Sequence, residues 1–72
     1  MPIKFSKHAR DRMAERGIAE IDVETALLQP IGDPVPGQPG TVLVDGFAPD
    51  GRILRVCVRD DDHGYVITAY WR

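Results

Sequence analysis

The hydrophobic pattern of the chain changes its period near Thr41, and this change limits the folds open to it. Before that point apolar residues recur at the three- and four-residue spacing of a helix, as in Val23, Ala26 and Leu27. From Thr41 onward apolar and polar residues alternate, which is the pattern of a half-buried strand. The order of the two patterns predicts an α+β fold in which helices precede strands.

Two short helices are expected in the first part of the chain. Ser6 is a good N-cap and Gly17 suits the left-handed position that ends a helix, so the first helix spans residues 7–16. The second spans residues 20–28 and ends before Pro30, which cannot continue it. The first helix is too short to be stable alone. It must therefore pack on an apolar surface formed further along the chain.

The alternation predicts three strands, at residues 41–47, 53–59 and 65–71. Short turns join them, so an antiparallel meander is expected, with Val44 opposite Val56 and Val56 opposite Ala69. That register turns one face of the sheet toward the helices. The residues on this face are Val42, Val44, Gly46, Leu54, Val56, Val58, Ile67, Ala69 and Trp71. The opposite face, called the open face below, carries Asp45, Arg55 and Tyr70 in one cross-strand row.

Residues 29–40 hold four prolines and three glycines, and we expect no regular element there. A structureless connection of this length is often mobile or functional in a small domain, and both interpretations are open. At 72 residues the whole chain, residues 1–72, is expected to form a single domain. Such a domain buries only ~60% of the surface that its unfolded chain exposes, so self-association or a partner protein is expected.

The net charge of −2 counts against a protein that simply coats nucleic acid, because such proteins rely on clustered Lys and Arg. No apolar run is long enough for a membrane span, and no signal-peptide pattern opens the sequence. We therefore expect a cytoplasmic protein without membrane contact. Its single cysteine, Cys57, rules out an internal disulfide and should be reduced in that compartment.

A set of residues spread over nearly the whole chain forms a recognisable pattern. It consists of His8-Ala9, Arg12-Met13, Arg16-Gly17-Ile18, Val23, Leu27, Asp50-Gly51 and Val66-Ile67-Thr68-Ala69-Tyr70. The pattern resembles a small bacterial family, domain of unknown function 4258, which is similar to the RelE and BrnT toxins. Those toxins are ribonucleases with two helices on an antiparallel sheet. The resemblance implies the same ααβββ fold, RNA as a target and an antitoxin as a partner. The acidic balance and the few lysines depart from a typical toxin.

RNA cleavage without a metal needs a base for the 2′-hydroxyl, an acid for the leaving oxygen and cations for the phosphate charge. His8 could serve as base or acid, Tyr70 as proton donor, and Arg55 as a phosphate ligand, so these are the candidate catalytic residues. The candidate RNA- and phosphate-binding residues are Arg12, Arg59 and Arg72. His8 and Tyr70 come from opposite sides of the sheet, so they can meet only at its edge.

Structural interpretations of the same residues are also open. Asp45, Arg55 and Tyr70 could form only a cross-strand ion pair with a stacked ring. His8 could bond Asp11 or a carbonyl at a strand end and so orient its helix.

We expect no metal and no cofactor. The acidic run Asp60-Asp61-Asp62-His63 has the residue types of a cation site, but consecutive positions in a tight turn rarely converge on one ion. The sequence contains no zinc spacing and no phosphate-cradling glycine loop.

Two functions thus follow from the sequence. One is a toxin-like, metal-independent endoribonuclease, or a catalytically faded relative that acts on RNA. The other is a non-enzymatic protein-binding or homodimerising module. Ile21 and Leu28 favour the second, because they are seven residues apart on the second helix and would leave an apolar patch if the first helix does not cover them.

Overall fold

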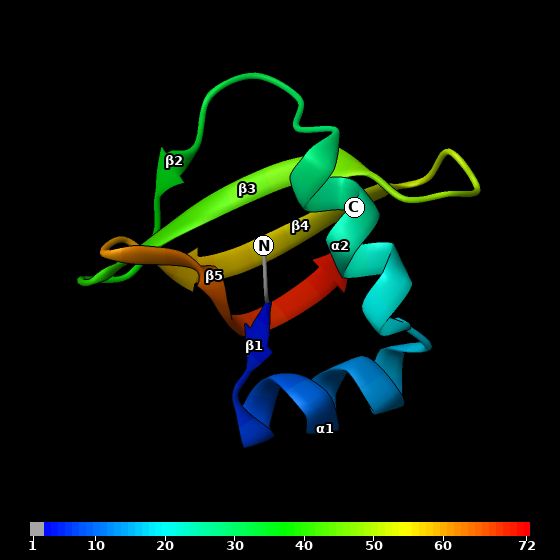
Figure 1. Ribbon diagram of the computed structural model, residues 1–72, viewed down its shortest axis with the longest axis horizontal. Coiled ribbons are helices and arrows are strands. Elements are labelled where there is room, and N and C mark those ends of the chain that lie inside the picture. The colour runs from blue at the N-terminus through cyan, green and yellow to red at the C-terminus, as the bar shows by residue number, and fades with distance from the viewer. Residues whose placement is uncertain (1–2) are drawn as a thin grey trace.

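The computed structural model describes residues 3–72. Its elements in chain order are β1 (Lys4–Phe5), α1 (Lys7–Arg16), α2 (Glu20–Leu28), β2 (Val35–Pro36), β3 (Thr41–Phe47), β4 (Ile53–Arg59) and β5 (Asp62–Trp71) (Figure 1). The fold is mixed α+β, as predicted. Both helices, β3 and β4 span the residues that the sequence pattern predicts, whereas the rest of the sheet differs.

Within the described residues the sheet has five strands, in the order β1-β5-β4-β3-β2, so the prediction of a sheet with only three strands is wrong. β3, β4 and β5 are antiparallel neighbours at its centre. β1 is added at one edge and pairs in parallel with β5, where Lys4 lies opposite Tyr65. β2 is added at the other edge, where Val35 lies opposite Leu43. The prediction failed because each added strand is two residues long and carries no periodicity.

The expectation of no regular element in residues 29–40 is likewise wrong, because β2 lies inside this segment. Pro36 is tolerated there because an edge strand does not need the N–H that proline lacks. The start of the segment is tied to β3 as well, since the Ile31 N–H donates to the Asp45 carbonyl at 2.7 Å. Prolines and glycines thus shape a segment that stays hydrogen-bonded to the sheet.

β5 begins at Asp62, three residues earlier than predicted, and its pairing with β4 is interrupted by a bulge. The expected pairs of Val56 with both Val44 and Ala69 are present. Beyond Cys57 the register shifts, so Val58 lies opposite Val66. Val66 is completely buried, and it takes the core position that the alternation assigned to Ile67. A bulge inserts one extra residue, which a strict period of two cannot anticipate.

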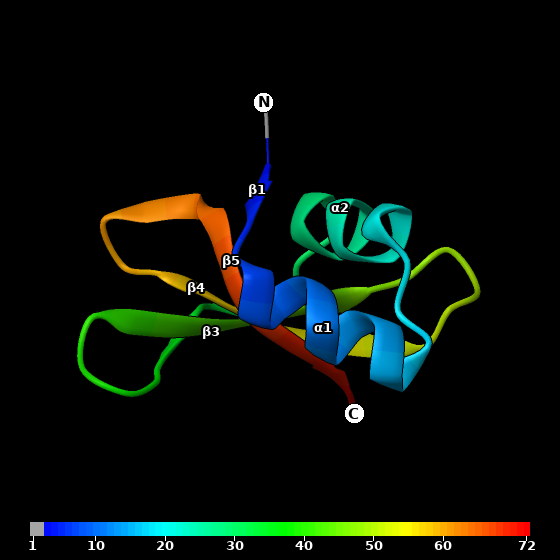
Figure 2. The same cartoon turned by 90° about the horizontal axis from the view of Figure 1, so that it is seen from below.

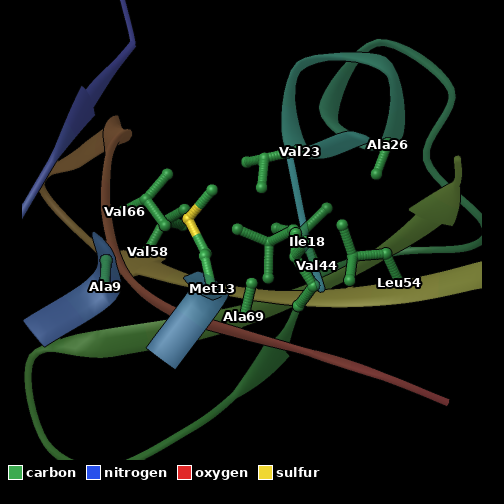
Figure 3. Packing of buried hydrophobic residues seen from close by; sticks show 11 residues of the cluster. Ala9, Met13, Ile18, Val23, Ala26, Val44, Leu54, Val58, Val66 and Ala69 are labelled. Carbon is green, nitrogen blue, oxygen red and sulfur yellow. The ribbon is translucent and has the colours of Figure 1, made fainter. Parts of the chain in front are cut away.

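Both helices pack on the same face of the sheet and enclose one apolar core. α1 lies alongside β5, while α2 packs on β3 and β4 (Figure 2). The core consists of Ala9, Met13, Ile18, Val23, Ala26, Val44, Leu54, Val56, Val58, Val66 and Ala69 (Figure 3). Within residues 3–72 no helix has the length and hydrophobicity needed to cross a membrane.

α2 approaches β3 very closely at Gly46. A methyl group at this position would lie 2.6 Å from the carbonyl carbon of Ala26 and 2.8 Å from its Cα. Real side chains do not approach backbone atoms so closely, so α2 packs directly on the bare backbone of β3. Glycine at position 46 is therefore part of the fit between helix and sheet.

Candidate functional site

Helix α1 is fixed to strand β5 at both of its ends. At the start, the Ser6 hydroxyl accepts the Ala9 N–H at 3.0 Å, and the Ser6 N–H donates to the Val66 carbonyl at 3.1 Å. At the end, the indole N–H of Trp71 donates to the Arg16 carbonyl at 3.0 Å. These bonds make α1 run beside β5 in the same direction, along one edge of the sheet (Figure 1).

Arg16 reaches from α1 around this edge toward the open face. Its Nη1 donates to the carbonyl of Ala69 at 2.8 Å and lies 3.4 Å from the Thr68 hydroxyl. Its guanidinium carbon lies 5.9 Å from the centre of the Tyr70 ring, within the range of a cation–π interaction. The positive charge of Arg16 therefore sits beside Tyr70, although the two residues belong to different layers.

The helix geometry puts His8 and Arg12 on the same side of α1 as Arg16. Each of these residues follows the previous one by four positions, so consecutive members are displaced by only ~40° around the helix axis. Arg10 lies on the other side of the buried Ala9 and pairs with Glu20 of α2 at 2.7 Å. We call His8, Arg12 and Arg16 the basic stripe; it follows the edge of the sheet on the side away from α2.

On the open face, two arginines converge on one carboxylate. Arg55 binds Asp45 through two hydrogen bonds, Nε to Oδ1 at 2.6 Å and Nη2 to Oδ2 at 2.9 Å. Arg72 adds a third at 2.7 Å. With Arg16 and Tyr70 these residues form a group that we call the edge cluster. It contains three guanidinium groups and one carboxylate, so it carries an excess of positive charge.

The charges of the edge cluster stabilise one another. The hydrogen bond from Arg55 lowers the pKa of Asp45 below its ordinary value of 3.8; burial opposes this effect, and Arg72 reinforces it. The pKa of Arg55 is raised, first by Asp45 and then by Tyr70. Asp45 is therefore ionised at neutral pH and makes a poor proton acceptor, so its role in the cluster is to position Arg55 and Arg72.

The structure brings together only some of the residues that the sequence proposes for the site. Arg55, Tyr70 and Arg72 meet in the edge cluster. His8 is exposed and lies eight residues before Arg16, about 12 Å along the helix axis. Within residues 3–72 its side chain makes no hydrogen bond, so the expected bond to Asp11 or to a strand-end carbonyl is not observed.

Arg12 and Arg59 also lie outside the edge cluster. Arg12 pairs with Glu15 on the surface of α1 at 2.7 Å. Arg59 binds Asp61 through two hydrogen bonds of 2.8 and 2.9 Å, and its guanidinium carbon lies 5.6 Å from the centre of the Tyr65 ring. Arg59 therefore belongs to the hairpin between β4 and β5, at the other end of the sheet from Tyr70.

Sequence reasoning did not assign Arg16 to the site, although a signal was present. Its spacing of four and eight residues from Arg12 and His8 indicates one helix face. That face could be placed at the sheet edge only once the position of α1 beside β5 was known. Among the described residues, no group of three or more His, Cys, Asp or Glu side chains is arranged to hold a metal ion. Cys57 is free and buried.

In a comparison with protein families, the model of a domain of unknown function, DUF4258, matches residues 5–71. The chain belongs to this family. The match confirms the family resemblance seen in the sequence and spans the basic stripe and nearly all of the edge cluster, with Arg72 just beyond it. Comparisons with curated proteins and with solved structures return no match for this DUF4258 domain.

Proposed function

We propose that this DUF4258 domain binds the backbone of RNA at the edge cluster and cleaves it slowly without a metal. The observation that carries the proposal is that Arg16 and Arg55 both lie beside Tyr70. Arg72 joins Arg55 on the carboxylate of Asp45. The resemblance of the sequence to RelE- and BrnT-like ribonucleases supports RNA as the ligand.

Arg16 has the features of a phosphate ligand. Its hydrogen-bond partners are the neutral oxygens of Ala69 and Thr68, and no carboxylate within residues 3–72 pairs with it. Arg55 and Arg72 share the single carboxylate of Asp45. A guanidinium presents its donors in a rigid fork that matches the oxygens of a phosphate. A bound phosphate would thus supply the negative charge that the edge cluster lacks.

Tyr70 is the group best placed for proton transfer. In cleavage the 2′-hydroxyl of RNA loses its proton to solvent water, its oxygen bonds to phosphorus to form a 2′,3′-cyclic phosphate, and the bond from phosphorus to the 5′-oxygen breaks. The arginines stabilise the charge on the phosphate, while the Tyr70 hydroxyl donates a proton to the leaving oxygen. The aromatic ring can also stack on an unpaired base, which is how single-stranded RNA is commonly bound.

His8 is too far along α1 to share a phosphate with Tyr70, so we assign it, with Arg12, to the flanking RNA along the basic stripe. The reaction then has a proton donor but no positioned base for the 2′-hydroxyl. A general acid or base commonly contributes about 10²–10⁴-fold to a rate, so cleavage without the base should be slow. The domain is therefore expected to bind RNA more effectively than it cuts it.

The two tyrosines of β5 provide a matched test of this proposal. Each ring lies near an arginine, Tyr70 near Arg16 and Tyr65 near Arg59. A labelled single-stranded RNA would be incubated with the wild type, Tyr70→Phe and Tyr65→Phe in the presence of a chelator. The reasoning predicts that Tyr70→Phe retains RNA binding and cuts about 10²-fold more slowly, while Tyr65→Phe cuts normally.

Two results would overturn the proposal. If folded wild-type protein does not bind RNA, then RNA is not the ligand of the edge cluster. Equal cleavage rates in the wild type and Tyr70→Phe would show that the Tyr70 hydroxyl takes no part in the reaction.

A further inference from the structure

A second surface lies on the helix side of the sheet, away from the edge cluster. It is a groove of about 660 Å³ between α2, the segment 30–34 that follows it, and His63 of β5, with Val44 among its lining. We call it the apolar groove. In Figure 2, α2 and β1 stand on the same side of the sheet.

The outer side of α2 forms one wall of the apolar groove and carries two exposed aliphatic side chains. Ile21 is 57% exposed and Leu28 is 82% exposed. They are seven residues apart, so they lie on one line along the helix, about 10.5 Å from each other. The opposite side of α2 buries Val23 and Ala26 in the core. An α-helix that is apolar on two sides normally has both of them covered, and here α1 covers neither Ile21 nor Leu28.

The charges around the apolar groove are acidic. Apart from His63, the charged residues in its lining are Glu24 and Asp33. The sequence has no Lys or Arg between Gly17 and Gly51, so neither α2 nor the segment after it offers a compensating cation. A partner that buries its apolar side in this groove would gain from positive charge at its flanks.

We propose that the apolar groove binds an amphipathic helix of another protein, with aliphatic residues on one side and Lys or Arg on its flanks. Helices bind in grooves of this kind through anchors of their own, spaced by three, four and seven residues. A helix that lies along α2 places such anchors against both Ile21 and Leu28, which line the groove about 10.5 Å apart. Leu28 lines the groove and is nevertheless 82% exposed, so a helix lying along α2 covers more of its surface than a small molecule inside the groove does.

A second copy of this chain fits the groove less well. Symmetric pairing brings each residue of a patch close to the same patch on the partner. Glu24 and Asp33 of one copy would then approach Glu24 and Asp33 of the other, and like charges across an interface oppose association. The acidic flanks therefore favour a basic partner over self-association.

Two model peptides test the inference. Both would carry the same leucine face on a helix-forming sequence, one with lysines and the other with glutamates on the polar side. Fluorescence anisotropy with the full chain would measure the affinity for each. The lysine peptide is expected to bind at least about tenfold more tightly than the glutamate peptide, with a difference that shrinks as salt is added.

Point variants locate the binding site. Leu28→Gln should weaken binding of the lysine peptide about tenfold or more, because an exposed anchor is lost. Ile53→Gln is the matched control, since Ile53 is also an exposed aliphatic residue but lies on β4, outside the groove lining. It should leave the affinity unchanged, and circular dichroism would verify that both variants fold.

Three outcomes would overturn the inference: no binding of either peptide, equal binding of both, or equal effects of the two substitutions. A dimer of the wild type that Leu28→Gln converts to monomer would also overturn it, in favour of a second copy as the occupant. None of these results bears on RNA binding at the edge cluster, so the two proposals stand or fall separately.

Discussion

Replacing Gly46 by alanine should destabilise the fold far more than the addition of one methyl group suggests. The new Cβ would overlap the backbone of Ala26, and a backbone cannot rotate away as a long side chain does. Overpacking a core typically costs about 1–3 kcal/mol. Because α2 itself must shift to relieve this overlap, we expect a loss of about 3 kcal/mol or more, at or beyond the top of that range.

A loss of this size is large for a domain of 72 residues. Stability of ~0.05–0.15 kcal/mol per residue corresponds to a total of roughly 4–11 kcal/mol. In a domain of this size, about 3 kcal/mol lowers the melting temperature by roughly 12–24 °C. Thermal and urea unfolding followed by circular dichroism would measure the change. A variant that fails to fold agrees with the prediction.

Gly51→Ala is the control for this experiment. Gly51 has a positive φ of 88° and no atom within 4 Å of an added Cβ, so alanine there causes backbone strain without a clash. That strain should cost about 1–2 kcal/mol. If Gly46→Ala unfolds within about 0.5 kcal/mol of the wild type, the range typical of surface substitutions, then α2 does not pack on β3 as described.

Two further predictions concern single side chains. Ser6→Ala removes the N-cap of α1 and should lower the free energy of unfolding by about 0.5–2 kcal/mol, whereas Lys7→Ala next to it should change little; urea unfolding would show whether the two differ. The pKa of Asp45 is lower in the folded state than in the unfolded chain. Just below pH 3.8 the unfolded chain therefore binds more protons than the folded protein does. The contribution of Asp45 to stability is lost as the pH falls through its folded pKa. Asp45→Asn should therefore show a weaker loss of stability on acidification than the wild type, and identical pH profiles would contradict this.

Much of the fold could be predicted because its larger elements have strong local signals. The caps of α1 and the alternation in β3 and β4 are readable in the sequence, and so is the pairing of Val56 with Val44 and Ala69. β1 and β2 could not be predicted, because two residues show no period and their pairing depends on the rest of the sheet. The bulge beyond Cys57 similarly depends on how β4 and β5 twist together.

The candidate site was predicted less completely than the fold. The cross-strand row of Asp45, Arg55 and Tyr70 follows from alternation and register alone. The position of Arg16 beside Tyr70 does not, because it depends on α1 lying at the edge of β5 rather than over the centre of the sheet. The same placement separates His8 from Tyr70, which the residue types alone could not reveal.

The salt dependence of RNA binding tests the central claim most directly. Arg16 and Arg10 lie about 120° apart around the axis of α1, Arg16 against β5 and Arg10 against Glu20 of α2. Arg16→Gln and Arg10→Gln therefore remove the same charge from two different sides of one helix. The affinity for a single-stranded RNA would be measured for both variants and the wild type over a range of salt concentrations. We predict that Arg16→Gln reduces the slope of log K against log salt by about 0.7, the value for one phosphate contact on a single strand, and that Arg10→Gln leaves it unchanged. Equal slopes for the two variants would contradict RNA binding at the edge cluster.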